Sequence, residues 1–324
     1  MDIFSDVPES TVKVIYHNFL YIEFAVHIVG ICVSAAFLGI FSHLRSVHIN
    51  LIWILDSFIL SFCITTVWRI YYCAKMLLLD IEPGDEALFI GADLRDTSMY
   101  AAGLHMLLLS AERQVATIRS GTYENESHIL QICAAIVCIW LFSYFAVTTL
   151  RQQLFTNFLA AFIFLAIYGV SIMIMMHVRR ANFTKWKSHR GTLKFSQSFQ
   201  VRENVTSARY LYTCFVVFSV QTLIGWICLV LYLVFKRVLH IPLLEKIFGF
   251  VFDILLASQT TSIPLVIFFN NAQLKAQLRR ILSACCSLAS NHTNYIIDLE
   301  GRNMKVSSKD ETKTYFDQLK EAWS

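Results

Sequence analysis

The sequence predicts an all-α membrane protein, a bundle of seven transmembrane helices followed by a short amphipathic helix. Three observations lead to this fold class. Of the 324 residues, 56% are hydrophobic and only 15% are charged, whereas soluble domains carry about 25% charged residues. The apolar residues gather into runs of roughly 20 residues, the length that a helix needs to cross the hydrocarbon of a bilayer. Lysine and arginine are distributed unevenly between the segments that connect these runs.

Each apolar run is expected to be one span. The sixth contains no charged residue, whereas the third begins in the polar stretch ADLRDTSMY. Pro264 is the proline that falls within a span, so a helix hinge is expected there. The predicted spans are about 19–41, 51–70, 98–118, 128–150, 158–178, 210–235 and 248–269, which makes residues 19–270 the bundle and residues 1–18 a segment outside it.

The distribution of positive charge predicts the orientation, because lysine and arginine are enriched in cytoplasmic loops. One face of the membrane receives a long basic loop, 179–209, and the chain after the last span. That chain carries eight lysines and arginines from Lys275 to Lys320, in the segment 271–286 and the tail 287–324. The opposite face collects acids, as in LLLDIEPGDEALFIGADLRD. Residues 1–18 are therefore expected outside and the tail inside, in a multi-pass protein of the plasma membrane. Four glycosylation sequons lie on the face assigned to the cytoplasm, and their use would reverse this topology: Asn125, Asn182, Asn204 and Asn291.

The segment 271–286 follows the last span and reads NAQLKAQLRRILSACC. Its leucines and isoleucine recur at helical spacing on one face and its basic residues occupy the others, which predicts an amphipathic helix lying on the inner leaflet. Cys285 and Cys286 close this segment at a juxtamembrane position suited to palmitoylation, with two unmodified thiols as the alternative.

An acid and a base stand side by side at the inner end of the third span, as Glu112 and Arg113. The plain interpretation is an anchor at the interface, where arginine extends toward water. The sharper one is a switch, in which arginine is released from its acid when helices part and then reaches a cytoplasmic partner. With seven spans and residues 1–18 outside, the pair resembles that of G-protein-coupled receptors. The chain departs from that receptor pattern at two places. Gln114 occupies the position after the pair, where an aromatic residue is expected, and Pro264 lacks the usual preceding asparagine.

The stretch ERQVATIRSGTYE, from Glu112 to Glu124, carries a more specific resemblance. It is similar to the signature that ends span three in nematode serpentine chemoreceptors of the Sra superfamily. Class epsilon (Sre) fits best, since a long outer loop 1 and a short outer loop 2 also resemble that class. The related a, ab and b classes remain open. The resemblance implies a chemosensory receptor of the plasma membrane, in the cilia of sensory neurons, that signals through a heterotrimeric G protein. It implies the switch role for Glu112 and Arg113, and places Tyr123 and Glu124 where a partner would contact them.

A small chemical ligand is expected between the outer halves of the spans, where polar side chains face the interior of the bundle. An interhelical hydrogen bond is the alternative for each candidate. The candidates are Glu23, His27, Tyr100, His105, Trp226 and Asp253. Asp56, in the inner half of span two, is expected either to hold an ion or to bond to a neighbouring helix.

Other classes of function find less support. The chain has no GxSxG, HExxH or GxGD motif, so we expect no enzyme, and without paired CxxC motifs we expect no metal and no cofactor. The net charge of +4 is mild and gives no reason to expect nucleic acid as a partner. The absence of internal repeats disfavours a transporter. The main alternative is an inverted seven-span ligand-gated cation channel of the odorant-receptor type, with the tail outside and the sequons glycosylated.

Overall fold

The protein is described by a computed structural model. The structure describes residues 8–42, 47–79, 86–120, 123, 128–150, 154–188, 195–271, 274–279, 296–297 and 303–304. The chain divides into two compact units, Met1–Leu278 and Arg279–Ser324. In the described part of the second unit, β1 (Ile296–Ile297) and β2 (Asn303–Met304) form a short antiparallel pair.

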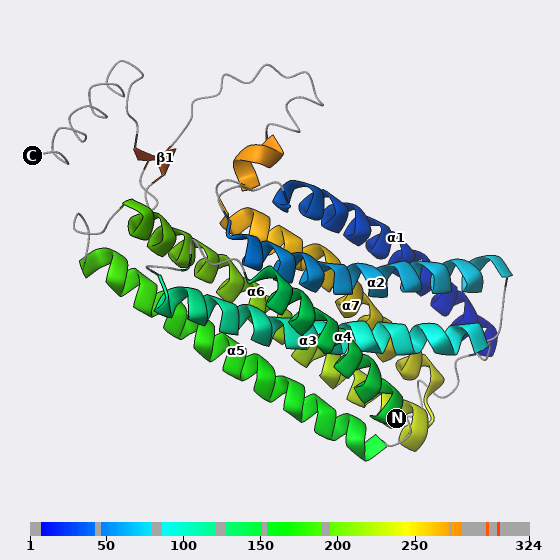
Figure 1. Cartoon of the computed structure of the whole chain (residues 1–324). Helices are drawn as coiled ribbons and strands as arrows, with labels where there is room; N and C mark the ends of the chain where they lie inside the picture. Colours follow the sequence, from blue (N-terminus) through cyan, green and yellow to red (C-terminus); the bar gives the residue numbers. More distant parts are fainter. Residues whose placement is uncertain are drawn as a thin grey trace, which may run out of the picture. The chain divides into compact units, whose positions relative to one another are not determined.

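The first unit is a bundle of long helices that run side by side (Figure 1). α3 is central, because it packs against α2, α4, α5 and α6. α6 continues directly into a π-helical turn, η3 (Phe235–Leu239). The helices are α1 (Glu9–Phe41), α2 (Ile49–Leu79), α3 (Glu86–Ile118), α4 (Ile129–Leu150), α5 (Leu154–Ser188), α6 (Phe195–Val234) and α7 (Pro242–Asn270).

Among the described residues, six helices are long and apolar enough to cross a membrane: α1, α2, α4, α5, α6 and α7. The helical, membrane-spanning class is thereby confirmed. α3 matches the third predicted span in position, but its charged residues at both ends lower its hydropathy. α3 packs against other helices, and several of its polar residues are buried against protein, among them Ser98, His105 and Ser110. Its status as a seventh span stays a prediction.

Several helices extend beyond the predicted spans, so the expectation of two long loops was wrong. α2 runs to Leu79 and α3 begins at Glu86, which makes most of the expected outer loop 1 helical. α5 likewise runs to Ser188 and α6 begins at Phe195, within the expected loop 179–209. α1 begins at Glu9, inside the segment placed before the bundle. Hydropathy detects the hydrocarbon-crossing part of a helix, whereas its hydrogen bonds continue into water wherever the residues are good helix formers.

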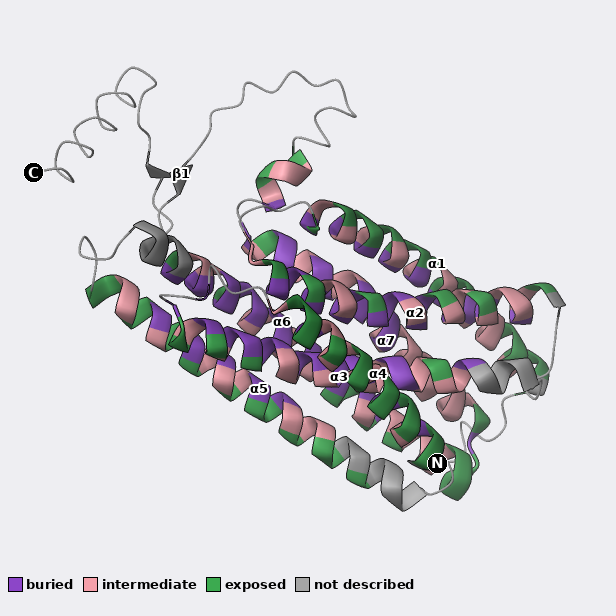
Figure 2. Cartoon of the chain, viewed as in Figure 1, coloured by how far each residue is buried: buried purple, intermediate pink, exposed green. Residues whose placement is uncertain are grey.

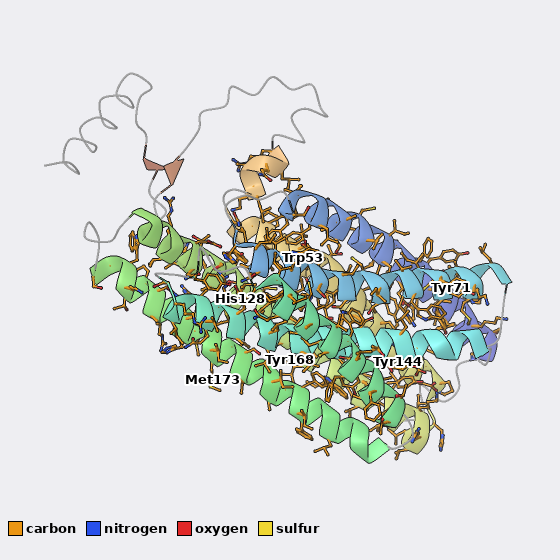
Figure 3. All side chains as sticks on the ribbon, viewed as in Figure 1. Trp53, Tyr71, His128, Tyr144, Tyr168 and Met173 are labelled. Carbon is orange, nitrogen blue, oxygen red and sulfur yellow. The ribbon has the colours of Figure 1, made fainter. Side chains whose placement is uncertain are left out.

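The core lies along the bundle axis, and the outer faces are also apolar (Figure 2). Aromatic rings such as Phe58 and Phe218 meet edge to face inside, with centroids 6.1 Å apart. Large side chains including Trp53, Tyr144 and Met173 are exposed on outward faces (Figure 3). A soluble protein rarely exposes so much continuous apolar surface, so the outer faces suit lipid.

The segment after α7 is described only in part. Residues 274–279 are helical, Leu274 is buried and Leu278 packs against the core. This is where the predicted amphipathic helix begins. The rest of 271–286, with Cys285 and Cys286, lies outside the described residues, so their lipidation stays a prediction.

Candidate functional site

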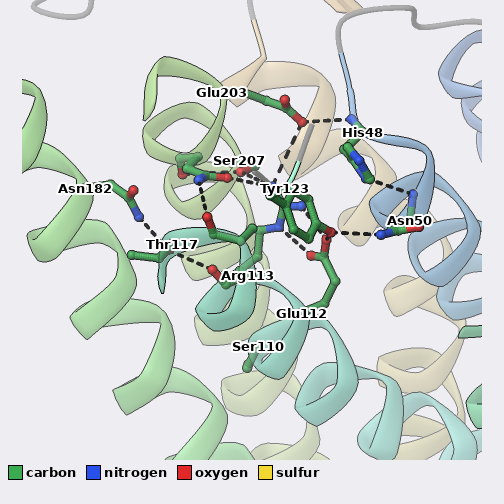
Figure 4. A network of polar contacts seen from close by, with 12 residues as sticks. His48, Asn50, Ser110, Glu112, Arg113, Thr117, Tyr123, Asn182, Glu203 and Ser207 are labelled. Carbon is green, nitrogen blue, oxygen red and sulfur yellow. Dashed lines mark hydrogen bonds and ion pairs between the residues drawn. The ribbon is translucent and has the colours of Figure 1, made fainter. Parts of the chain in front are cut away.

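The candidate switch pair lies inside a polar network at the end of α3 (Figure 4). The guanidinium of Arg113 is fully buried and donates from Nε to Glu112 Oε2 at 2.5 Å and from Nη2 to Glu112 Oε1 at 2.5 Å. Two parallel charge-assisted bonds of this kind are among the strongest that side chains form. The two residues therefore hold each other in a fixed, desolvated geometry.

The remaining edge of the guanidinium ties α3 to α6. Nη1 of Arg113 donates to Asn204 Oδ1 at 3.1 Å and to Ser207 Oγ at 3.2 Å, and lies 4.0 Å from a carboxylate oxygen of Glu203. Asn204 Nδ2 in turn donates to the carbonyl of Ala116 at 3.3 Å. Each of these contacts requires α6 to lie close to α3, so they bias the bundle toward a closed arrangement.

Tyr123 links the same network to α2. Its hydroxyl donates to Glu112 Oε1 and accepts from Asn50 Nδ2 at 3.0 Å. Its ring lies 4.4 Å from that of His48, whose backbone N–H donates to Glu203 at 2.8 Å. We call Asn50, Glu112, Arg113, Tyr123, Asn204 and Ser207 the Arg113 network. Tyr123 is buried in this structure, so its contact with a partner stays a prediction, and Glu124 lies outside the described residues.

Burial governs the ionisation of Tyr123 and of its neighbour His48, which both lie outside the predicted spans. It raises the pKa of Tyr123 well above its ordinary range, and the adjacent Glu112 carboxylate raises it further. Burial also lowers the pKa of His48, more than the Glu112 carboxylate raises it. Both groups are therefore neutral near pH 7, so neither adds a charge beside the buried acid–arginine pair.

Two of the sequons belong to the same end of the bundle. Asn182, on α5, is fully buried and donates to Thr117 Oγ1 at 2.7 Å and to its own helix at 2.8 Å. Asn204 is buried within the Arg113 network. A glycan is bulky and needs a surface position, so neither asparagine accepts one in the folded bundle.

A second group of buried charges lies toward the opposite end of the bundle. Arg69 on α2 bonds to Glu23 on α1, from Nε at 2.6 Å, and its Nη2 lies 2.9 Å from Asp253 Oδ2 on α7. His27 Nε2 lies 3.5 Å from Glu23 Oε1. We call Glu23, His27, Arg69 and Asp253 the Arg69 cluster. Glu23, His27 and Asp253 were predicted as ligand-binding residues, but here Arg69, which the sequence analysis missed, joins the two carboxylates, and His27 lies against Glu23.

Pro264 lies within a continuous α7 and leaves a carbonyl without its helical donor. That carbonyl belongs to Thr260, four residues earlier, and Ser34 Oγ on α1 donates to it at 2.7 Å. Thr66 on α2 bonds to the Thr260 hydroxyl at 2.7 Å. Gly30 allows this close approach, because a Cβ at that position would lie 3.1 Å from Thr260 Cβ. The predicted hinge is thus held by a neighbouring helix.

Tyr100 and Trp226, two other predicted ligand contacts, line one cavity. Its volume is about 330 Å³, and α3, α5, α6, η3 and α7 contribute to its wall. Small-molecule sites are typically apolar clefts of about 300–1,000 Å³ with a few polar groups. The structure thus separates the predicted residues into two sets, one that lines a cavity and one that forms the Arg69 cluster.

His105 and Asp56 belong to neither set. His105 is fully buried and bonds to Ser57 Oγ at 2.8 Å and to the Ala101 carbonyl at 2.6 Å, which is the interhelical alternative. Asp56 Oδ1 is buried without a hydrogen-bond partner among the described residues. In that part of the chain, no group of three or more His, Cys, Asp or Glu is placed to hold a metal. The proposed bond of Asp56 to another helix is therefore not seen at this oxygen.

These features together define a class of protein. A helical bundle with six apolar helices, outer faces suited to lipid, a cavity among its helices and a buried network around its central helix is the architecture of a multi-pass membrane receptor. The chain belongs to the family of Sre G protein-coupled chemoreceptors, because residues 72–324, more than three quarters of its length, match that family. The resemblance seen in Glu112 to Glu124 is thereby confirmed. No curated protein matches the chain.

Proposed function

We propose that this protein is a chemosensory receptor whose helix bundle binds a small ligand in the cavity lined by Tyr100 and Trp226, and which signals to a heterotrimeric G protein through Arg113. One observation carries this proposal. Arg113 is fully buried by contacts that join α3 to α6, and not by contacts within α3 alone. A cation held this way is a switch when a movement of α6 frees it.

The proposed mechanism is a shift between two arrangements of the bundle. In the closed arrangement, Asn204 and Ser207 accept hydrogen bonds from Nη1 of Arg113, and the Tyr123 hydroxyl donates to the Glu112 carboxylate. Movement of α6 breaks the bonds to Arg113 and leaves its fork free to bind a G protein, together with Tyr123 and Glu124 once that segment opens. A ligand shifts the bundle toward the open arrangement by as much as its affinity for the open arrangement exceeds its affinity for the closed one. The cavity lies between α6 and α3, so a ligand there contacts both moving parts.

In this proposal α3 crosses the membrane as the third of seven spans. Residues 1–18 are extracellular, and the Arg113 network faces the cytoplasm. The basic residues in the extensions of α5 and α6 support this orientation, since positive charge is retained inside. The protein then resides in the plasma membrane, in the sensory cilia of the cell that expresses it. The burial of Asn182 and Asn204 favours this orientation over the inverted channel, whose topology would glycosylate the sequons.

The orientation is tested by expressing the full chain with a tag at its C-terminus. We expect antibody access to the tag only after permeabilisation, and no mobility shift on endoglycosidase treatment. An exposed tag with a glycan at Asn125 or Asn291 would support the inverted channel and end the receptor proposal.

Coupling is tested with the purified receptor and a panel of G-protein heterotrimers, by measuring nucleotide exchange on the α subunit. We expect Arg113→Gln to lower exchange to the level of empty membranes while it keeps a neutral hydrogen-bond donor in the network. Lys187→Gln, at the exposed end of α5, is the matched loss of one positive charge. Equal exchange by wild-type receptor and Arg113→Gln, at equal surface expression, would refute the switch.

A further inference from the structure

The cavity has an aromatic interior. The rings of Tyr100 on α3 and Phe164 on α5 lie with their centroids 4.6 Å apart, and Tyr168, Trp226 and Phe252 also contribute to the wall. Tyr168, labelled in Figure 3, is itself packed in the core of the bundle. Such a wall favours binding of an apolar ligand, because the apolar surfaces of both leave water when they meet.

The polar part of the same wall carries more positive than negative charge. Its charged members are Arg95, Asp96 and Arg237. Arg95 Nε bonds to Asp96 Oδ1 at 2.9 Å, so these two charges balance each other. Arg237 has no carboxylate within ion-pair distance among the described residues, whereas its neighbour Lys236 lies 3.8 Å from Glu245. Arg237 is solvent-exposed, and its guanidinium is the one at the cavity wall that no described carboxylate balances.

The segment that carries Arg237 departs from regular geometry. η3 is a π-helical turn, and the next residue, His240, has a φ of 50° in the left-handed region. Left-handed backbone is uncommon for residues other than glycine, and π-helical turns occur frequently at functional sites. An uninterrupted α-helix would present a different face of residues 235–239 to the cavity. The unusual turn and the unpaired charge therefore coincide at one place in the wall.

From this coincidence we infer that the cavity binds an anionic amphiphile, a carboxylate on an apolar body, with Arg237 pairing with the carboxylate and the aromatic wall covering the body. Guanidinium binds a carboxylate through two parallel hydrogen bonds, which gives direction as well as affinity. The inference rests on the proposed function, since it names the ligand class of the proposed cavity. A lipid headgroup and a free carboxylate share this chemistry, and we assign the free carboxylate.

The test uses three probes of equal chain length and different charge: octanoate, octylammonium and octanol. The full-length receptor is placed in nanodiscs of zwitterionic lipid, and binding is followed through the fluorescence of Trp226, as the difference between wild type and Trp226→Phe. We expect octanoate to bind more tightly than the other two. Arg237→Gln weakens octanoate by about tenfold or more, as the loss of a charge-assisted pair requires. Lys236→Gln, the matched control in the same turn, changes it less than twofold.

A second variant separates binding in the cavity from partition into the lipid. Gly225 lines the cavity, and a Cβ there would lie 3.6 Å from Phe252 Cδ2, which is ordinary contact. Gly225→Ala therefore narrows the cavity without displacing the helices, and we expect it to weaken octanoate.

The outcomes separate this inference from the proposed function. Tighter binding of octylammonium or octanol that is sensitive to Gly225→Ala would overturn the anionic ligand and keep the cavity as the ligand site. Octanoate binding that is lost when phosphatidylglycerol is added to the nanodisc would assign Arg237 to a lipid headgroup and also overturn it. No change in Trp226 fluorescence with any probe, or a change unaffected by Gly225→Ala and Arg237→Gln, would remove the ligand site itself. Coupling through Arg113 is still judged by nucleotide exchange.

Discussion

Replacing Asn204 with alanine removes two bonds between α6 and α3 and leaves the acid–arginine pair in place. The lost bonds are the one that Asn204 Oδ1 accepts from Arg113 Nη1, at 3.1 Å, and the one that its Nδ2 donates to the Ala116 carbonyl, at 3.3 Å. Alanine is the better helix former, so α6 itself keeps its structure. The substitution therefore weakens the closed arrangement of the Arg113 network specifically.

The expected size follows from the two bonds. A hydrogen bond to a charged group contributes about 1.5–3 kcal/mol and a neutral one about 1 kcal/mol. Their loss together favours the open arrangement by about 3 kcal/mol, and each 1.4 kcal/mol changes an equilibrium by about tenfold. Because Ser207 still accepts a bond from Nη1 at 3.2 Å, we expect basal signalling to rise by roughly tenfold to a hundredfold.

The assay is ligand-free nucleotide exchange on a G protein, normalised to receptor at the cell surface. Thr206→Ala is the matched control, because Thr206 is half-buried on α6 and its hydroxyl donates to the carbonyl of Arg202 in its own helix rather than to α3. We expect this control to signal at the wild-type level. Unchanged or lower exchange by Asn204→Ala, at normal surface expression and with a coupling-competent wild type, would refute the role of these bonds in closing the bundle.

Three further predictions concern the stability of the purified receptor. Ser34→Ala leaves the Thr260 carbonyl without its donor and lowers the free energy of unfolding by about 1–3 kcal/mol, which a thermal melt detects against Thr149→Ala, an exposed control. Arg69→Gln leaves the buried carboxylate of Glu23 and the half-buried one of Asp253 uncompensated and costs about 3–5 kcal/mol, so we expect little folded protein. A triple variant that also neutralises Glu23 and Asp253 but folds no better would contradict this cause. Because burial lowers the pKa of His48, the unfolded chain binds the proton more readily, so stability is full above about pH 6.5 and falls as the pH drops below it; His48→Gln removes this part of the pH dependence.

Hydropathy located the helices but not their ends. All seven predicted spans coincide with long helices, because about 20 apolar residues in a row have few other folds available. The extension of α5 to Ser188 was missed, since its last turns are basic and carry no hydropathy signal. The segment 179–209 therefore looked like a loop although most of it is helical.

The sequence indicated one half of the Arg113 network. Glu112 and Arg113 are neighbours in the chain, so their pairing could be read directly. The other half, Asn204 and Ser207, lies about 90 positions away and depends on the rotation of α6 about its axis, which composition does not determine. Tyr123 was identified through the family signature alone, and its bond to Glu112 becomes visible only when the turn after α3 is in place.

Arg69 shows a different kind of miss. It falls at the end of the second predicted span, about 51–70, and was not among the predicted site residues. The usable signal was a balance of charge: an arginine at that depth needs a carboxylate, and Glu23 and Asp253 lie at similar depth in two other spans. Treating these three residues as one group would have predicted the Arg69 cluster instead of separate ligand contacts.

The burial of Asn182 and Asn204 has a consequence for how the protein is made. Glycans are added in the lumen while the chain is being synthesised, before its helices assemble. A chain inserted upside down would expose both asparagines to that enzyme and would then carry sugars at two places where α5 and α6 must pack against α3. Such a chain could not close its bundle. In the proposed orientation both asparagines stay out of the lumen, so the packing of α5 and α6 against α3 is left intact.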